Sequence, residues 1–244
     1  MPKPNVDLLY MAKNRLEFTR ESFAALERNT NWNLIRNFVI YDDGSTDGTL
    51  EFLEENAKYR NAELRQTDFG NSVDVFGDYI KRFEPGAEFF AKVDNDAMYP
   101  PNWLDISLGV LDRHAELQLL GVEYGGFNDG GELPHTYILH PKGHIGGLFV
   151  ARSSILQIRP NEPLVSQNRY WGWQEWVSGR KLMRGWLKPA IPTFVLDRVY
   201  FDPWISYTKK YEAAGWQRGW IRYNHSHDHL WEGWCPWIQP QKTA

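Results

Sequence analysis

Cysteine is almost absent from this chain of 244 residues, in which Cys235 is the only one. A single cysteine excludes an intrachain disulfide framework and is typical of proteins from a reducing compartment. Long apolar runs are also absent: none approaches the roughly 20 residues needed to cross a bilayer. Residues 1–5 lack the apolar core of a signal peptide. We therefore expect a soluble, cytoplasmic protein without a membrane span.

A large excess of charge of either sign is lacking as well. The 27 Lys and Arg and 31 Asp and Glu leave a net charge of −4, so bulk electrostatics do not favour a polyanionic partner. Nucleic acid is therefore not an expected partner, although charge alone does not exclude it. Aromatic residues are abundant, with 12 Trp, 12 Tyr and 13 Phe. Half of the tryptophans lie after residue 200, which favours either sugar stacking or core packing there.

Strands and helices are expected to alternate along the first half of the chain. Four short apolar runs are typical of buried strands: residues 6–11, 37–41, 62–66 and 89–93. Apolar residues at helical spacing follow the first three runs, with Thr19 as a candidate cap of the first helix and Thr46 or Asp47 of the second. This alternation predicts βα units on a parallel sheet.

Two acidic clusters follow predicted strands. Asp42 and Asp43 end the second strand, and Asp94 and Asp96 follow the fourth. Alternate residues of an extended chain face the same side, so we expect Asp94 and Asp96 to converge. Such oxygen donors suit Mg²⁺ or Mn²⁺, whose usual companions are phosphate oxygens. A solvated turn is the alternative. Because parallel sheets collect ligands beyond the carboxyl ends of their strands, the shared placement favours a binding site.

A resemblance to a known family rests on four segments in one order: residues 41–49 (Tyr-Asp-Asp-Gly-Ser-Thr-Asp-Gly-Thr), 93–96, 146–152 and 172–186. In this order they resemble family 2-like glycosyltransferases of the GT-A fold. The resemblance implies a Rossmann-like α/β domain over residues 1–199, with a mixed, mostly parallel sheet flanked by helices. A Trp- and His-rich C-terminal extension, residues 200–244, is then expected to pack on or near the active site.

The resemblance also implies a nucleotide site formed by Ala12, Asn14, Arg15, Asp42, Asp43, Lys92 and Asp94. Asp43, with Asp42, would lie against the base, because a carboxylate can accept the imide hydrogen of a base. Asp94 would contact ribose or metal, and Asp96 would be the principal ligand of Mn²⁺ or Mg²⁺. Lys92 would lie near the phosphates, or alternatively extend from its strand to solvent.

Catalysis is assigned to Glu175 by the same resemblance. The family usually carries Glu-Asp where this chain has Gln174 and Glu175, and the second position supplies the base in inverting members. Glu175 could instead only cap a helix start. The donor and acceptor pocket is expected to include Gly146, Gly147, Trp171, Trp173 and Gln174. The alternatives are a β-bulge for the two glycines and core packing for the two tryptophans.

Three histidines at period two, His225, His227 and His229, form a further candidate site. In several GT-A enzymes a late histidine completes the metal site, and His227 is our first choice because it is central. Imidazole would favour Mn²⁺ over Mg²⁺. A zinc site is an alternative that the single Cys235 supports weakly, and an exposed tail is another.

The function expected from these residues is metal-dependent, inverting glycosyl transfer. The donor would be a nucleoside-diphosphate sugar, with UDP-sugars first, and the acceptor an unidentified hydroxyl, on a glycan before a modified nucleobase. A sugar-nucleotide nucleotidyltransferase is the first alternative. It would require a Gly-rich phosphate loop after the first strand, and residues 12–15 are not one. The second is a non-catalytic carbohydrate-binding protein, against which Asp94, Asp96 and Glu175 argue.

Overall fold

The structure is a computed structural model that describes residues 5–84, 86–99, 101–121, 137–139, 149–156, 184–187 and 194–195. The helices of this part are α1 (Leu16–Asn29), α2 (Thr49–Arg60), α3 (Ser72–Lys81) and α4 (Trp103–Arg113), with two short 3₁₀ turns, η1 (Trp32–Leu34) and η2 (Ser153–Leu156). The strands are β1 (Val6–Ala12), β2 (Ile35–Asp42), β3 (Glu63–Gln66), β4 (Phe89–Asp94), β5 (Ala97–Met98), β6 (Leu119–Gly121), β7 (Tyr137–Leu139), β8 (Phe149–Arg152), β9 (Arg184–Leu187) and β10 (Phe194–Val195).

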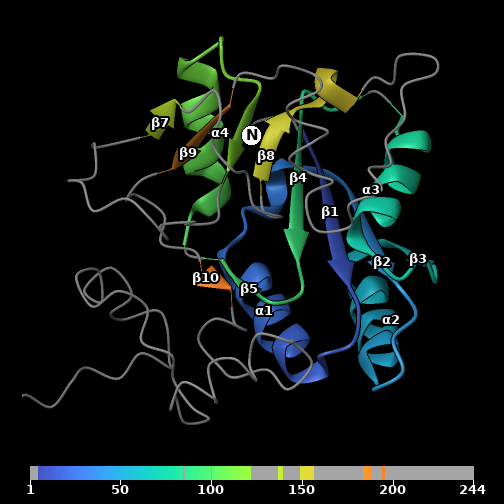
Figure 1. Cartoon of the computed structure of the whole chain (residues 1–244). Coiled ribbons are helices and arrows are strands. Elements are labelled where there is room, and N and C mark those ends of the chain that lie inside the picture. Colours follow the sequence, from blue (N-terminus) through green and yellow to red (C-terminus); the bar gives the residue numbers. More distant parts are fainter. Residues whose placement is uncertain are drawn as a thin grey trace, which may run out of the picture.

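The main sheet is mixed, as predicted from the sequence. Its strand order is β3-β2-β1-β4-β8-β6-β9-β7, and β5 pairs separately with β10. Strands β1 to β4 are parallel to one another, whereas β8 is antiparallel to β4, as the arrows show (Figure 1). The predicted α/β fold class is therefore confirmed.

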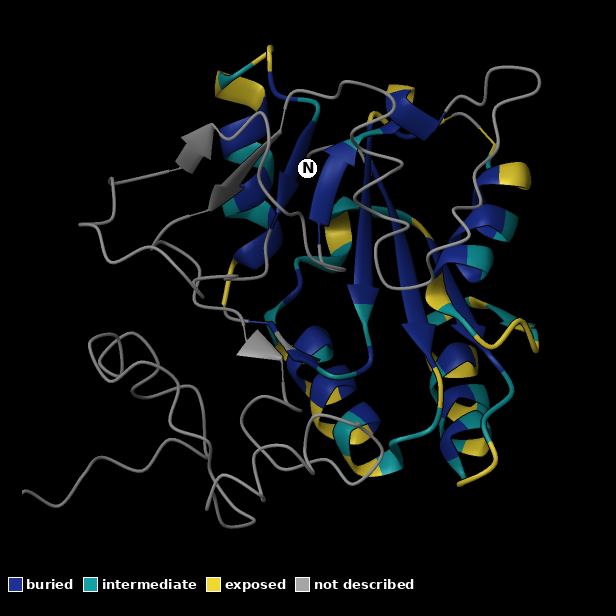
Figure 2. Cartoon of the chain, in the orientation of Figure 1, coloured by how far each residue is buried: buried dark blue, intermediate teal, exposed yellow. Residues whose placement is uncertain are grey.

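Helices cover both faces of the sheet, which explains why β1, at its centre, is buried along its whole length. Leu8 and Tyr10 of β1 belong to the core shared with α1, α2 and α4. Leu9 and Met11 point the other way, into the core beneath α3. Figure 2 shows β1, β4 and β8 mostly buried, with exposed residues on the helices and turns around them. No helix in the described ranges has the length and apolar character needed to pass through a bilayer.

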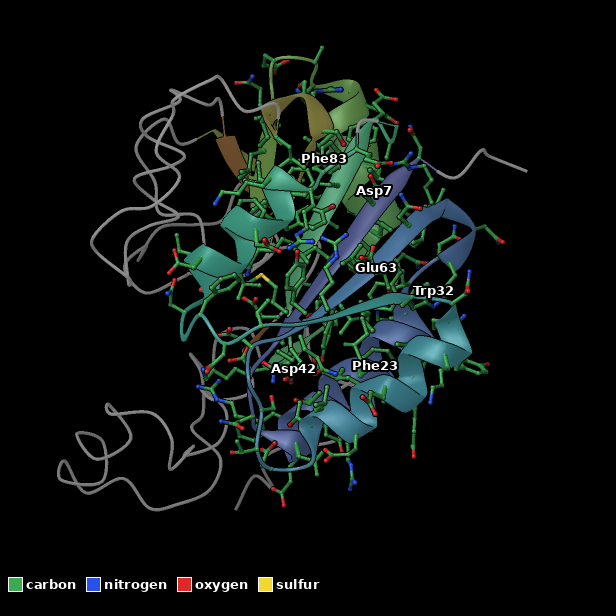
Figure 3. The ribbon with its side chains drawn as sticks, turned by 90° about the vertical axis from the view of Figure 1, so that its right-hand side faces the viewer. Asp7, Phe23, Trp32, Asp42, Glu63 and Phe83 are labelled. Atoms are coloured by element: carbon green, nitrogen blue, oxygen red, sulfur yellow. The ribbon has the colours of Figure 1, made fainter. Side chains whose placement is uncertain are left out.

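The strand register brings the ends of β1, β2, β3 and β4 together at one edge. Ala12 pairs with Asp42, Asp42 with Gln66, and Met11 with Asp94. In Figure 3, Asp42 lies at this edge and Asp7 at the opposite end of the sheet. The two acidic clusters, more than 50 residues apart in sequence, thus become neighbours because parallel strands end at the same edge.

The start of α1 differs from the prediction. Thr19 does not cap this helix, which begins at Leu16 and has Arg15 at its N-cap. Thr19 lies inside the first turn, where its hydroxyl donates to the carbonyls of Asn14 and Arg15. The helix begins earlier because Asn14 and Arg15 both take left-handed backbone conformations, with φ of 54° and 65°. Such a turn has no clear signature in apolar spacing.

Candidate functional site

A cavity of about 490 Å³ opens at the edge where the parallel strands end. Its described lining comprises Met11, Ala12, Lys13, Asn14, Arg15, Asp43, Asn71, Ser72, Val75, Asp94, Asn95 and Asp96. Six of the residues expected from sequence are thus brought together, from the ends of β1, β2 and β4 and the turns that follow them: Ala12, Asn14, Arg15, Asp43, Asp94 and Asp96.

The side chains of Asp42 and Asp43 have different surroundings at this edge. Asp43 lines the cavity, and its Oδ1 accepts hydrogen bonds from the Phe69 amide at 2.7 Å and the Thr67 hydroxyl at 3.1 Å. Its Oδ2 lies 3.5 Å from Lys13 Nζ. The Asp42 carboxylate instead holds the turn after β2, where Oδ2 accepts from the Ser45 amide at 2.9 Å. Asp42 is buried and is absent from the described lining of the cavity.

Asp94 and Asp96 face the cavity for a different reason from the one expected. β4 ends at Asp94, and Asn95 and Asp96 form a turn, so strand alternation does not extend to Asp96. Asn95 fixes this turn: its side-chain amide donates to the carbonyl of Asn14 and the hydroxyl of Thr19, both at 2.8 Å. Asn95 is thereby turned inward, and the carboxylates on either side of it are left at the cavity.

Buried hydroxyl groups hold the backbone of Asp94. Its carbonyl accepts from Tyr99 Oη at 2.6 Å and from Ser22 Oγ at 3.1 Å, and Tyr10 Oη donates in turn to Ser22 Oγ. Burial raises the pKa of both tyrosines, and the nearby negative charges of Asp94 and Asp96 raise it further. Both phenols therefore remain protonated near neutral pH and keep the acidic turn in place.

Two cations pair with the two carboxylates of this turn. Arg15 Nη1 lies 2.5 Å from Asp96 Oδ2, and Lys92 Nζ lies 2.5 Å from Asp94 Oδ1. Only 1% of the Lys92 side chain is exposed, so the alternative of a lysine extending to solvent is wrong. With the Lys13–Asp43 pair, each carboxylate that lines the cavity has a basic neighbour.

The turn that carries Arg15 is strained and strongly held. Two consecutive non-glycine residues with positive φ are uncommon and persist only where the surroundings determine them. Here the Asn14 amide donates to Ser45 Oγ at 2.7 Å, and Asn14 Oδ1 accepts from the Thr46 amide at 2.8 Å. Arg15 was expected in the nucleotide site. The structure directs its guanidinium to Asp96, at the expected metal position.

The carboxylates fit a divalent cation that shares its coordination with a nucleotide. Mg²⁺ and Mn²⁺ in such sites are held by one or two carboxylates together with substrate phosphates. Asp94 and Asp96 provide two carboxylates at one cavity. Within the described residues, there is no group of three or more His, Cys, Asp or Glu that could hold a metal ion by itself. Two carboxylates at one cavity are the number that such phosphate-completed sites use.

Several lining residues were not anticipated from the sequence. Lys13, Asn71, Ser72 and Val75 all border the cavity, the last three at the start of α3. Asn71 is the N-cap of α3, because its Oδ1 accepts from the Asp74 amide at 2.9 Å. An Asn before an apolar helical run is a readable cap signal, but only the fold brings that helix end to the acidic edge.

The remaining expected site residues lie outside the described part of the chain: Gly146, Gly147, Trp171, Trp173, Gln174, Glu175 and His227. The boundary between residues 199 and 200 lies outside it too. Their assigned roles stay predictions.

Comparison with known proteins begins with sequence. No protein-family model matches the chain. Over 123 residues, or 48% of its length, the chain is 26% identical to an uncharacterized glycosyltransferase of Haemophilus influenzae. The match spans only 36% of that relative.

Solved structures give a wider match. The chain resembles S. aureus TarS in complex with UDP, with a TM-score of 0.60 and 16% identity over 78% of this chain and 60% of that one. It also resembles GalNAc-T7 with UDP, GalNAc and Mn²⁺, with a TM-score of 0.59 and 12% identity over 89% and 52% of the two chains. The fold is that of the GT-A glycosyltransferases. The GT-A architecture implied by the resemblance is thus confirmed, and the cavity lies at the carboxyl edge of its parallel strands.

Proposed function

We propose that the protein is a metal-dependent glycosyltransferase that moves a hexosyl or pentosyl group from a nucleoside-diphosphate sugar to an acceptor hydroxyl with inversion. One observation carries the proposal: Asp43, Asp94 and Asp96 line a single cavity at the carboxyl edge of a GT-A sheet. A carboxylate that can accept a hydrogen bond from a nucleobase and two carboxylates that can hold a metal are thereby placed within reach of one nucleotide.

The nucleotide lies along this edge, with its base at Asp43 and its phosphates at the Asp94–Asp96 turn. Oδ1 of Asp43 is held by Thr67 and Phe69, which leaves Oδ2, beside Lys13, to accept an imide hydrogen. An imide hydrogen is a feature of uracil, so UDP-sugars are the first choice of donor. The UDP in the similar TarS and GalNAc-T7 structures supports this choice.

Asp96, with Asp94, holds the divalent cation, and His227 is assigned as its late ligand. A bound Mn²⁺ or Mg²⁺ neutralises the negative charge that develops on the departing diphosphate. Lys92, buried behind Asp94, adds a fixed positive charge on the same side. The Mn²⁺ in the GalNAc-T7 structure supports a divalent metal for this fold.

Glu175 is assigned as the general base. The acceptor oxygen attacks the anomeric carbon while the bond from that carbon to the diphosphate oxygen breaks. The acceptor's proton passes to the Glu175 carboxylate, and the nucleoside diphosphate leaves with the bonding electrons. Attack opposite the leaving group inverts the anomeric configuration.

The test combines binding and turnover. Wild-type protein, Asp96→Asn and the control Asp112→Asn, an exposed residue of α4, are incubated with a panel of sugar nucleotides and Mn²⁺. We expect donor hydrolysis or transfer by wild type and control, and loss of both activity and Mn²⁺-dependent UDP binding in Asp96→Asn. Full activity in chelator, or in Asp96→Asn, contradicts the proposal.

A further inference from the structure

Arg15 forms an ion pair with Asp96, the carboxylate that the proposed function assigns to the metal. Its Nη1 lies 2.5 Å from Asp96 Oδ2, and the two side chains are only 20% and 16% exposed. A guanidinium in contact with a mostly buried carboxylate compensates a charge that would otherwise be costly to leave unpaired. Arg15 thus fills the electrostatic role of a cation at Asp96.

We propose that Arg15 exchanges between two anions: it holds Asp96 before ligands bind, and it contacts the nucleotide's diphosphate once a divalent cation takes its place. The inference rests on the proposed function, because it requires both a cation and a diphosphate at this cavity. It adds to that function a residue that binds the diphosphate and that weakens metal binding to the nucleotide-free protein.

Charge is the physical reason for the exchange. A divalent cation on Asp96 repels the guanidinium that already touches the same carboxylate, so the two compete for it. The diphosphate that accompanies the cation offers new acceptors beside it. Arg suits this second contact because its planar fork of donors matches phosphate oxygens as well as carboxylates.

The backbone explains why Arg15, and not Lys92, makes the exchange. Lys92 is 1% exposed and shares the α3 face of β4 with the core residue Phe90, and its Nζ lies 2.5 Å from Asp94 Oδ1. Arg15 lies at the N-cap of α1, on the cavity lining. The left-handed conformation of Asn14 and Arg15 keeps its side chain at this position. Rotation about side-chain bonds is then sufficient to move the guanidinium between two anions in one cavity.

Arg15→Asn is the decisive variant, because asparagine tolerates the left-handed conformation that most residues avoid. Lys13→Gln is its matched control: it removes one positive charge from the same cavity at a residue paired with Asp43 rather than Asp96. Two quantities are measured: Mn²⁺ affinity of nucleotide-free protein, from the electron paramagnetic resonance signal of free Mn²⁺, and UDP affinity at saturating Mn²⁺, by calorimetry. Thermal unfolding checks that each variant is folded.

The two affinities are expected to change in opposite directions. Relative to Lys13→Gln, Arg15→Asn binds Mn²⁺ at least about fivefold more tightly, because the competing cation is gone. Its UDP affinity falls at least about tenfold, as expected for loss of a charge-assisted hydrogen bond. Simple damage to the site would weaken both. Arg15→Lys keeps the charge without the fork, so its Mn²⁺ affinity stays near wild type while UDP binding weakens.

Other outcomes overturn the inference. If wild type binds UDP with Mn²⁺, but Arg15→Asn and Lys13→Gln change Mn²⁺ affinity equally, the exchange is contradicted and the proposed function survives. If Arg15→Asn fails to fold, equal Mn²⁺ and UDP affinities for Arg15→Lys and wild type contradict it in the same way. If wild type binds no UDP at any Mn²⁺ concentration, the proposed function fails and the inference fails with it.

Discussion

Lys92 and Asp94 form an ion pair on one side of β4, with 2.5 Å between Nζ and Oδ1. They are two residues apart and therefore project from the same face of the strand. That face packs beneath α3, where Phe90 belongs to the apolar core. The Lys92 side chain is 1% exposed and that of Asp94 is 28% exposed, so the pair runs from the core to the cavity. A carboxylate that lines the cavity is thus tied to a buried cation.

Replacing Lys92 by methionine tests this pair. Lys92→Met keeps the length of the side chain but leaves Asp94 without its partner. We expect the free energy of unfolding to fall by about 1–3 kcal/mol, below the value for a fully buried pair because Asp94 is partly solvated. Urea denaturation measures the loss. Lys81→Met, on the exposed side of α3, is the control and should change stability by less than about 0.5 kcal/mol. Adding Asp94→Asn should recover part of the loss, and strict additivity would show that the pair is not coupled.

Asp43→Asn tests the base-binding position. The substitution keeps an oxygen for the Thr67 and Phe69 donors and replaces the oxygen at the cavity by a donor. An imide hydrogen then meets a donor instead of an acceptor. We expect UDP affinity to fall about 10- to 100-fold, the value of a hydrogen bond to a charged group, with little change in thermal unfolding. Calorimetric titration with UDP measures this. Unchanged affinity would place the base elsewhere.

Asp47→Asn should affect stability instead of binding. The Asp47 carboxylate accepts from the Leu16 amide at 3.0 Å and the Thr49 amide at 3.1 Å, and so joins the starts of α1 and α2. Loss of one of these bonds should lower the free energy of unfolding by about 1 kcal/mol. UDP affinity should be unchanged. Losses of UDP affinity equal to those in Asp43→Asn would contradict this division of roles.

The stability that Asp47 provides should depend on pH. Burial acts to raise its pKa, but hydrogen bonds from Thr49 and from the Leu16 amide outweigh burial and lower it. A carboxyl group whose pKa is lower in the folded state stabilises the fold above its unfolded pKa. That contribution is lost as the pH falls through the folded pKa. The difference in urea midpoint between wild type and Asp47→Asn should therefore be largest at neutral pH and shrink in acid. A difference that grows in acid would reverse the sign and exclude this role.

Glu175→Gln tests the general base, because it keeps the size of the side chain and removes its basicity. We expect turnover to fall at least ~10²-fold, the low end for general-base catalysis, with donor affinity little changed. Nuclear magnetic resonance of the wild-type product should show the anomeric configuration opposite to that of the donor. Retained configuration would remove the need for a base and leave Glu175 to position the acceptor.

His227→Ala tests the late metal ligand. If His227 completes the site, the variant needs a higher Mn²⁺ concentration for half-maximal activity, and truncation after Tyr200 has at least the same effect. His114→Ala is the control, since His114 follows α4 and is not among the described residues that line the cavity. Identical Mn²⁺ titrations for wild type, His227→Ala and the truncated chain would assign the tail histidines no part in metal binding.

The sequence by itself determined the order of strands and helices and the position of both acidic clusters at strand ends. These features depend on local causes: apolar runs that favour strands, helical spacing that favours α1 to α3, and Asp and Gly residues that form turns. A parallel sheet then requires that the ends of its strands meet. The expectation that Asp43, Asp94 and Asp96 share one cavity follows from those local signals together with one rule of topology.

Only the tertiary structure decided which groups share that cavity and what each carboxylate contacts. Asp42 and Asp43 are adjacent in sequence, yet one closes a turn and the other reaches the cavity, because successive residues at a strand end face different ways. Arg15 meets Asp96 across 81 positions of sequence. Their contact depends on the register of β1 with β4 and on two left-handed residues held by hydrogen bonds from a distant turn. Such contacts arise from three-dimensional packing, which local propensity does not encode.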